Sequence, residues 1–530
     1  MHLSREELLK IDKQFIDSLP GKSAKELCLL ALDDLKELHE RLGQNSENSS
    51  MPPSSNFPWA RFDADAQADE EEPDEEQVEA THIELDDSDE ESAEHDENAD
   101  RSDQQDSPEN TDDRPKGNKP GKQPGAAGHG RTQQLPVHDT IIHKAGTCSA
   151  CNLELDETCD FIARTGHYVV DIEVGDATGP GIEVINTKHI YGDTTCGGCG
   201  HVNRLMPHRL EKNEDWGVEI SQWHMVGPKL TALIVCLSKR MRLSRRRIRE
   251  FLQDWLRLNL SIGTINQCIH EAGRAVSPLS DEFLEEVRES LILFVDETSW
   301  KEWGKKQWLW VFTSLKVTFY IIGLRSQKVL DYVLGQTFKG VLMSDGYKAY
   351  RKFLNRLRCW AHLLRKTKGL KQSLSDDPRT FGTEAYEVLT ELMDVIYKAR
   401  GGPPTDLLPI YREFLAEFKQ CCMKYRDSTH KKTRELAREF LNDWDTIFHV
   451  LSNPTWPLTN NEAEQALRHW VIARKLSHGT RNGQGSHVFA ILASVIDTCR
   501  KRNACPWKYL AEVITARRQG LDVPPLPLTA

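Results

Sequence analysis

The sequence predicts a multidomain α/β protein, and three observations lead to this prediction. The chain has 530 residues, which is more than one hydrophobic core usually organises, so we expect several domains. Strand-like apolar segments and a helix-like segment occur together between residues 289 and 350, as in an α/β domain. Two Cys-x-x-Cys pairs stand well before these segments, which indicates a separate, smaller metal-binding module.

Charge is distributed unevenly along the chain. The net charge is -13, but the segment from Arg61 to Asp113 holds 25 Asp and Glu against two Arg and no Lys, which gives -23. The remainder therefore carries +10, and a basic folded part is compatible with a nucleic-acid partner. We interpret the acidic segment as a disordered linker, because it has too little apolar surface to offset its ordering entropy. The alternative is a nucleic-acid mimic that covers the protein's own basic surface.

Composition also indicates a compartment. No apolar run reaches the length needed to cross a bilayer, and the first residues lack the charged-then-apolar order of a signal peptide. The 13 cysteines suit thiols and metal in a reducing compartment better than a disulfide framework. We therefore expect a cytoplasmic protein with no membrane partner.

The first 130 residues are predicted to comprise a helix and a long linker. Residues 1–44 carry one amphipathic helix, in which Leu and Ala recur at helical spacing with charges between them. Residues 45–130 form the acidic linker and end in a basic, Gly- and Pro-rich arm. The arm either lies along phosphates or serves as a hinge.

Two cysteine pairs predict a zinc-finger domain at residues 131–212. Thiolates two residues apart can reach one tetrahedral ion, so we expect zinc at a ribbon-like site. The four predicted ligands are Cys148, Cys151, Cys196 and Cys199. Cys159 is a possible substitute ligand, and four surface thiols without metal are the alternative. Four thiolates leave no open position for a substrate, so the zinc would be structural.

Residues 213–285 are predicted to be a helical, helix-turn-helix-like DNA-binding region. The stretch from Gly227 to Gly273 fits three short helices, the last capped at Ser261. Basic residues cluster around the middle helix: Arg242, Arg245, Arg246, Arg247 and Arg249. Such a unit places one helix in the major groove, and we take Arg245, Arg246 and Arg247 as candidate DNA contacts. The alternative is a basic, solvated helical bundle.

A sheet that carries two acidic residues is predicted between residues 289 and 350. An apolar run that fits a buried strand ends in Asp296, and two more strand-like runs follow. A helix-like segment then precedes a fourth run, which ends in Asp345. Strand, strand, strand, helix, strand is the order of an RNase H-like fold, in which the fourth strand lies parallel beside the first. Asp296 and Asp345 should therefore be neighbours.

Two neighbouring aspartates suit phosphodiester chemistry. They can hold a pair of Mg²⁺ ions, which activate water and stabilise the leaving oxygen. For either Asp296 or Asp345 alone, a turn or capping role is the alternative. Glu297 is a weaker candidate, because its side chain should point to the opposite face of the strand.

A third carboxylate is predicted at the start of a later helix. Thr459 and Glu462 have the spacing of a capping box, so we assign Glu462 a structural role. Glu464 flanks the buried stripe of the same helix and can lean towards the sheet, which makes it the candidate third ligand. The alternative for Glu464 is an ion pair with Arg468 one turn later.

These motifs together resemble the transposases of the IS66 insertion-sequence type, which are DDE recombinases with an RNase H-like core. The resemblance extends over nearly the whole chain through NSENSSMPPSSN, GKQPGAAGHGR, the cysteine pairs, VDETSW, SDGYKAY, RCWAHLLRK and NNEAEQALR. It implies a catalytic triad of Asp296, Asp345 and Glu464, which would bind Mg²⁺ or Mn²⁺. It also implies a catalytic core at 286–500 with a helical insertion at about 370–453, followed by a C-terminal tail at 501–530.

The resemblance implies a bacterial, nucleoid-associated enzyme that cleaves and joins double-stranded DNA. It would bind terminal inverted repeats and target DNA as a homo-oligomer, with accessory proteins encoded by the same element as further partners. Candidate phosphate contacts in the core are Arg468, Arg474, Lys475 and Arg481. Cys359 and His362 resemble a Cys-x-x-His signature of several DDE groups, with packing as the alternative. The rival function is an inactive, transposase-derived protein that only binds DNA.

The chain departs from the family pattern in two places. The acidic linker replaces an expected Lys-rich stretch, which leaves regulation open. His469 and Ala473 stand where the family pattern has Pro and Gly, which affects the expected DNA-end contacts rather than the carboxylates.

Overall fold

The computed structural model describes residues 135–528, apart from 177, 337 and 404, together with scattered positions between Gly21 and Asn48. The scattered positions from Lys22 to His39 are helical. The rest of the predicted N-terminal helix, the acidic segment and the basic arm lie outside the described residues. In the described part, no helix is both long enough and apolar enough to cross a membrane.

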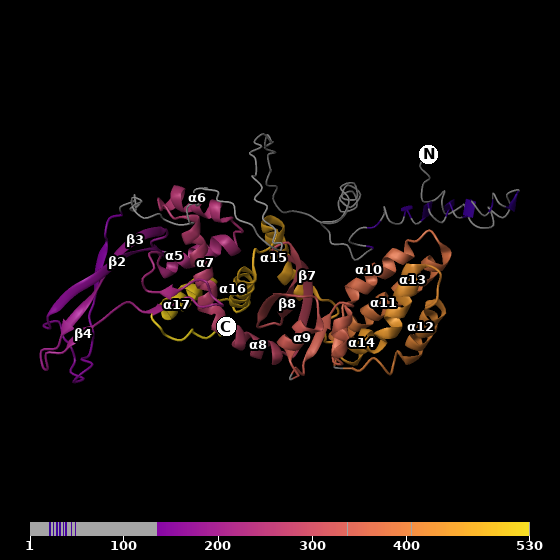
Figure 1. Ribbon diagram of the computed structural model, residues 1–530. Helices are drawn as coiled ribbons and strands as arrows, with labels where there is room; N and C mark the ends of the chain where they lie inside the picture. Colours follow the sequence, from indigo (N-terminus) through magenta and orange to yellow (C-terminus); the bar gives the residue numbers. More distant parts are fainter. Residues whose placement is uncertain are drawn as a thin grey trace, which may run out of the picture. The chain divides into compact units, whose positions relative to one another are not determined.

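Residues 135–221 form two small sheets (Figure 1). The larger sheet has the order β1-β3-β2, with β4 paired to β3; β1 runs parallel to β3, whereas β2 and β4 are antiparallel to it. Its strands are β1 (Asp139–His143), β2 (Phe161–Val174), β3 (Ile182–Thr195) and β4 (Val202–Arg204). The smaller sheet is an antiparallel ribbon of β5 (Arg209–Leu210) and β6 (Ile220–Ser221).

The apolar core is distributed unequally. One continuous cluster of buried apolar residues extends from β2 through the rest of the described chain, whereas the cysteine end of the larger sheet has its own small cluster of Cys148, Leu155 and Cys196. Three buried side chains exclude little apolar surface from water. The cysteine end of this sheet therefore needs another source of stability.

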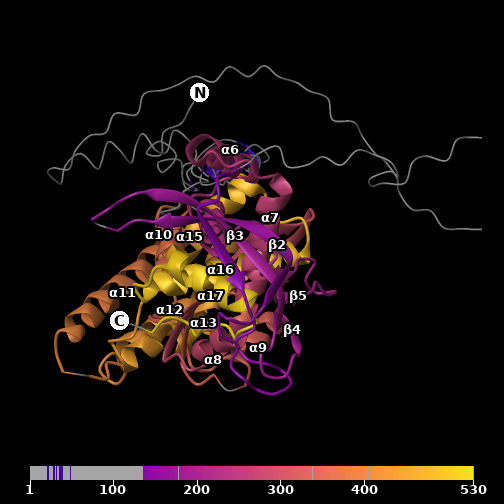
Figure 2. The ribbon, with the colours of Figure 1, turned by 90° about the vertical axis from the view of Figure 1, so that its left-hand side faces the viewer.

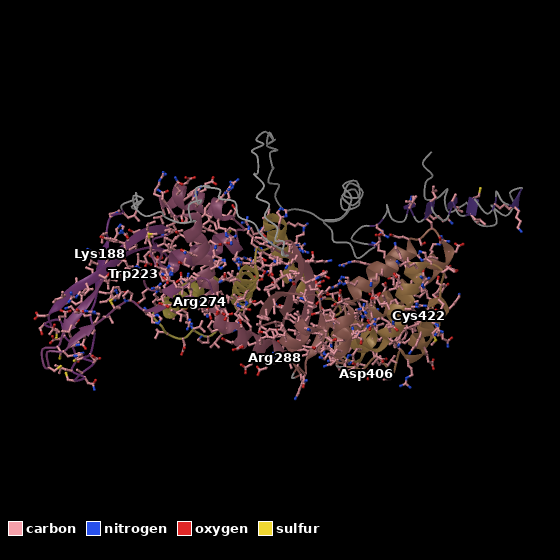
Figure 3. All side chains as sticks on the ribbon, in the orientation of Figure 1. Lys188, Trp223, Arg274, Arg288, Asp406 and Cys422 are labelled. Carbon is pink, nitrogen blue, oxygen red and sulfur yellow. The ribbon has the colours of Figure 1, made fainter. Side chains whose placement is uncertain are left out.

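A helical region follows the sheets. Its elements are α5 (Pro228–Lys239), α6 (Arg245–Leu256), α7 (Ile262–Val276), η2 (Ser277–Leu279) and α8 (Ser280–Arg288). As predicted, three helices lie between Gly227 and Gly273, and the Ser261 hydroxyl caps α7 by accepting from the Thr264 amide. Arg242 precedes α6 rather than lying on it. Arg274 of α7, labelled in Figure 3, donates to the Val218 and Glu211 carbonyls and so fixes the β5–β6 loop.

The central sheet has five strands in the order β11-β10-β7-β8-β9. β7, β8 and β9 form an antiparallel meander, and β10 lies parallel to both β7 and β11. The elements are β7 (Ile292–Glu302), β8 (Lys305–Thr313), β9 (Thr318–Gly323), α9 (Gln327–Leu334), β10 (Val341–Ser344), η3 (Lys348–Lys352) and β11 (Arg356–Arg358). The predicted strand order, with the fourth strand parallel beside the first, is confirmed.

Six helical segments follow β11, the fifth strand of the central sheet, in the described chain. They are α10 (Trp360–Lys371), α11 (Asp376–Arg400), α12 (Arg412–Tyr425), α13 (Lys431–Asn442), α14 (Trp444–Phe448) and η4 (His449–Ser452). Figure 1 shows α11, α12 and α13 alongside one another. Buried ion pairs join this helical layer to the sheet, since Arg356 and Arg358 of β11 both bind Asp443.

The chain ends in three further helices, α15 (Asn461–Ser477), α16 (Gly483–Lys501) and α17 (Pro506–Arg518), drawn in yellow shades in Figure 2. α16 packs on β9 and α7, and α17 packs on α5 and α7. Residues 501–530 were predicted to be a tail, but α17 lies within them and buries Leu510, Val513 and Ile514. Arg518 at its end binds Glu271 through two hydrogen bonds of 2.8 Å, so this segment is part of the helical region.

Candidate functional site

Asp296 and Asp345 lie on neighbouring parallel strands. Met343 of β10 is aligned with Phe294 of β7, and continuing this register by two residues places Asp345 beside Asp296. Asp345 follows the last residue of β10, while Asp296 lies within β7. The sheet therefore brings together two carboxylates that are far apart in sequence.

The electrostatics of Asp296 reflect this arrangement. Burial, followed by the negative charges of Asp345 and Glu297, raises the pKa of Asp296 well above its ordinary value, and Glu464 adds to the effect. The backbone amide of Glu297 donates to Asp296 at 2.8 Å and opposes this rise. Asp296 and Asp345 repel each other, and neither forms an ion pair with another residue in the described part of the chain; a divalent cation would supply the missing positive charge.

Glu464 reaches this place from the first turn of α15, although the local structure differs from the predicted capping box. The N-cap residue is Asn460 rather than Thr459, and Glu462 pairs with Lys501 at 3.3 Å. The Asn460 side chain instead donates to the Val295 carbonyl at 2.9 Å. This bond fastens the start of α15 to β7, one residue before Asp296. Sequence reasoning missed Asn460 because the tertiary contact is not local.

Glu464 contacts two side chains from the β11–α10 junction. His362 Nδ1 lies 3.9 Å from Glu464 Oε1, and both atoms are buried without a hydrogen-bond partner among the described residues. One donor atom each of Cys359, His362 and Glu464 lie within 4.8 Å of one another. The Cys359 sulfur also accepts from the Asn460 amide at 3.3 Å. Cys359 thus helps to hold the start of α15, and the unpartnered Oε1 of Glu464 is available to a cation.

Glu297 has a different role from Asp296. Arg325 donates to its carboxylate at 2.6 and 2.8 Å, and the Tyr350 hydroxyl also donates to it. Burial and the charge of Asp345 raise the pKa of Glu297 to about 7 despite these donors. The Arg325 guanidinium also lies 4.0 Å from the centre of the Tyr347 ring. Glu297 therefore holds Arg325, a residue that sequence reasoning missed because nothing in its local pattern marks it.

A cleft of about 600 Å³ opens beside Asp345. Its lining comes from the sheet edge, α10 and α13, and includes Arg325, Asp345, Tyr347, His362 and Lys366. Lys366 is already paired with Glu439 at 2.8 Å, whereas the Arg325 side chain is about one-third exposed. The cleft thus adjoins the carboxylates and presents a cation and an aromatic ring to its interior.

The four predicted zinc ligands also come together. The sulfur atoms of Cys148 and Cys199 lie 3.6 Å apart, and those of Cys151 and Cys196 lie 3.7 Å apart. A tetrahedron with zinc–sulfur distances of about 2.3 Å has sulfur–sulfur edges of about 3.8 Å. The spacing therefore fits a four-coordinate zinc ion.

Both cysteine knuckles turn in the same way. The residue directly after the second cysteine of each pair has a positive φ, 57° at Asn152 and 70° at Gly200. Its amide donates to the carbonyl of the first cysteine at 2.9 and 2.8 Å, respectively. Cys159 lies beside the cluster, and its thiol contacts Asp156 at 3.7 Å. The clustered sulfurs are those of the two knuckles, and Cys159 is not among them.

The thiols of this cluster differ in acidity. Burial raises the pKa of Cys148, but the amides of Ala150 and Cys151 lower it to about 6. For Cys199 the His201 amide lowers the pKa, yet the neighbouring thiols and burial raise it to about 12. Four thiolates at this spacing repel one another, so they can all be ionised only around a cation.

The predicted phosphate contacts are arranged in two ways. Arg245, Arg246, Arg247, Arg468, Lys475 and Arg481 are exposed. Arg245 is close enough to Arg481 for their charges to interact: the packing of neighbouring residues around the exposed Arg245 side chain, followed by the charge of Arg481, lowers its pKa. Arg474 instead donates to the Thr298 hydroxyl at 2.8 Å and to the Ser299 carbonyl, so it supports β7. Arg245 at the start of α6 and Arg481 in the loop before α16 thus lie near each other.

Comparison with known proteins places these features in a wider group. Residues 224–488, half of the chain, match the model of the family described as "Transposase IS66 family". "Uncharacterized protein y4qI" from Sinorhizobium fredii (strain NBRC 101917 / NGR234) is 26% identical over 305 residues, which cover 51% of this chain and 55% of that protein. "Uncharacterized protein y4jO" from the same strain is 28% identical over 194 residues, which cover 36% of this chain and 54% of that protein. The chain thus spans about half the length of these relatives.

Proposed function

Because the chain belongs to the IS66 family of transposases, we propose that it is a DDE recombinase with an RNase H-like core. It binds the terminal inverted repeats of an insertion sequence, cleaves DNA at the element ends and joins them to target DNA. The observation that carries the proposal is the convergence of Asp296, Asp345 and Glu464 from three distant segments. The order of the five strands supports the RNase H-like assignment.

Asp296, Asp345 and Glu464 are the residues that would hold Mg²⁺ or Mn²⁺. When bound there, two such ions would acidify the attacking water and stabilise the leaving oxygen of the phosphodiester. The fit rests on the repulsion around Asp296 and on the unpartnered Oε1 of Glu464. Asn460 fastens the start of α15 to β7, so the three carboxylates are positioned before the substrate arrives.

The reaction consists of two displacements at phosphorus. In the first, water attacks the phosphodiester at the element end, and the bond from phosphorus to the 3′-oxygen breaks. In the second, the freed 3′-hydroxyl attacks a phosphodiester of the target strand: a new bond forms from this 3′-oxygen to phosphorus, and the bond from phosphorus to the target strand's own 3′-oxygen breaks. Arg325 is oriented by Glu297 towards the cleft beside Asp345. Its role is to bind a phosphate of the cleaved strand, since arginine donors match phosphate oxygens.

Regions outside the catalytic core contribute to DNA binding. The four cysteines hold a structural zinc ion that organises the end of the larger N-terminal sheet. The exposed arginines of α6 contact the DNA backbone, as does Arg481. Handling two element ends and a target calls for more than one copy of the chain, so we include a homo-oligomer on DNA in the proposal. Accessory proteins encoded by the same element are further proposed partners.

The test is cleavage and strand transfer on a labelled element-end duplex with Mg²⁺ or Mn²⁺. Wild type should nick the duplex only when the metal is present. Asp345→Asn should lose nicking while it binds the duplex as wild type does. Retained nicking in Asp345→Asn would contradict the assignment of the site. Binding without cutting in wild type, with metal present, would favour a protein that only binds DNA.

A further inference from the structure

The tip of the β7–β8 hairpin has an unusual turn. Glu302 pairs with Lys305, so Trp303 and Gly304 form a two-residue loop. Both have a positive φ, 49° at Trp303 and 74° at Gly304. Such loops strongly favour Asn-Gly or Gly-Gly, because a bulky side chain is strained in this backbone conformation. The conformation of the turn therefore disfavours a tryptophan at position 303.

The indole of Trp303 is also exposed to solvent. Its exposed fraction is 73%, whereas the strand residues Trp300 and Trp310 are fully buried. A large aromatic side chain on a turn gains nothing from the apolar core. Strain at an exposed aromatic residue indicates a function rather than a packing role.

Three lysines lie close to Trp303 in the hairpin. Lys301 and Lys306 are directly opposite each other across the hairpin, and Lys305 follows the turn; all three are exposed. Like charges in cross-strand positions repel each other. None of the three forms an ion pair with another described residue. Glu302, the acidic residue of the tip, accepts from the Ser486 hydroxyl, and the Lys306 ammonium lies 5.3 Å from the centre of the Trp308 ring. The tip thus carries three exposed lysines and one glutamate next to an exposed aromatic residue.

The tip is held firmly in place. The Trp303 amide donates to the Thr480 carbonyl at 2.9 Å, and the Thr480 amide donates to the Lys301 carbonyl at 2.9 Å. The Trp300 indole donates to the Thr480 hydroxyl at 3.0 Å. Gly479 approaches Lys301 so closely that a Cβ there would meet its carbonyl oxygen. A rigid support reduces the entropy lost when the tip binds a partner.

We infer that the hairpin tip binds DNA in which a base has left the helical stack, with the base on the Trp303 ring and phosphates on Lys301, Lys305 and Lys306. Bases stack on exposed aromatic rings whatever their sequence, and lysines bind the phosphates between them. Trp303 is seven residues beyond Asp296, directly after the end of β7. At about 3.3 Å per residue, the hairpin tip is roughly 23 Å from Asp296 along the strand. The inference rests on the proposed function and adds the form of DNA that the enzyme recognises away from the scissile bond.

The experiment compares two labelled DNAs without Mg²⁺ or Mn²⁺: a fully paired duplex and the same duplex with a short unpaired fork. Wild type should bind the fork more tightly. Trp303→Ala should lose this preference, with about a tenfold or greater loss on the fork and an unchanged affinity for the duplex. Trp303→Phe should keep most of the preference. Leu354→Ala, which truncates another exposed apolar residue, is the matched control.

The inference is overturned if Trp303→Ala keeps the wild-type fork preference, or if Trp303→Phe loses as much affinity for the fork as Trp303→Ala. The variant could instead change only the oligomeric state in sedimentation, which would make the tip a contact between copies. Wild type that binds both DNAs with equal affinity would overturn this inference alone. Wild type that binds neither DNA would refute the proposed function itself.

A second variant tests the lysines independently. Lys301→Gln combined with Lys306→Gln should lower the slope of log affinity against log salt concentration for the fork by up to about 1.4, since each single-strand phosphate contact contributes about 0.7. An unchanged slope would remove the phosphates from the inference.

Discussion

The cysteine cluster and the carboxylate cluster bring candidate metal ligands together in opposite ways. Each cysteine pair is local, and the turn after its second cysteine, at Asn152 or Gly200, aims both sulfurs the same way. The carboxylates come from β7, the end of β10 and the first turn of α15, and the sheet and buried contacts such as Asn460 position them. The first arrangement is a product of short-range geometry, and the second is a product of the whole core.

This difference predicts different consequences of losing metal. Around the cysteines the buried apolar cluster is small, so a zinc ion bound as proposed would itself stabilise the local structure. Around the carboxylates the apolar core is continuous and large, and it stabilises the fold while carboxylates repel one another within it. Zinc should therefore matter for structure, and the carboxylates for chemistry.

The largest expected effect distinguishes two glutamates on the same turn of α15. Glu464→Gln should reduce DNA cleavage by at least about a thousandfold, because a divalent ion contributes several kcal/mol of transition-state stabilisation. Glu462→Gln, which changes a residue paired with Lys501, should cleave within about threefold of wild type. Single-turnover rates on an element-end duplex measure both. Equal losses in the two variants would mean that α15 itself, rather than Glu464, had been disturbed.

The next effect concerns the cysteines. Cys148→Ser should lose zinc, because structural zinc sites have apparent binding free energies of about 10–16 kcal/mol that disappear with a ligand. Limited proteolysis should then cut within residues 145–204, while the core containing the carboxylates keeps its melting temperature. Zinc content by elemental analysis checks the ligand loss, and Cys159→Ser is the control that should retain zinc. Loss of the core transition in Cys148→Ser would contradict the separation of the two regions.

The same difference explains what the sequence could predict. The Cys-x-x-Cys spacing and the order of the strands can be read from short segments of sequence. The predicted cluster of Cys148, Cys151, Cys196 and Cys199 and the predicted neighbouring strands of Asp296 and Asp345 therefore match the structure. The capping box was wrong, because Asn460 is recruited by β7 instead of capping the helix with its side chain. Arg325 could not be found, since only the folded core brings it to Glu297.

A change of pH should have a smaller effect on stability, and the effect should have opposite signs in the core and in the cysteine region. The pKa of Glu297 is raised to about 7 from an ordinary value of 4.5. The folded state therefore holds this proton more tightly than the unfolded state, and its stabilising contribution is complete below about pH 4.5 and lost as pH rises through about 7. The contribution amounts to at most about 3 kcal/mol, at about 1.4 kcal/mol per pKa unit.

Thermal denaturation of the zinc-loaded protein without added Mg²⁺ measures this dependence. The melting temperature of the core should fall across that pH interval in wild type and fall less in Glu297→Gln. Acidification should release zinc from the thiolates, so the cysteine region should lose structure where the core gains stability. Parallel pH profiles for wild type and Glu297→Gln would refute the role of this carboxyl group.

The smallest effect separates Arg474 from Lys475, which are adjacent on α15. Arg474 donates to Thr298 and Ser299 of the strand that carries Asp296, so Arg474→Gln should lower the free energy of unfolding by about 1–2 kcal/mol. Lys475 is exposed, so Lys475→Gln should leave stability within about 0.5 kcal/mol. If Lys475 contacts a phosphate, its loss should reduce the salt slope of duplex binding by about 0.9. Denaturant titration and salt-dependent binding of both variants test this assignment. If Lys475→Gln loses as much stability as Arg474→Gln, the loss comes from changing the surface of α15 and not from removing the contacts of Arg474 with β7.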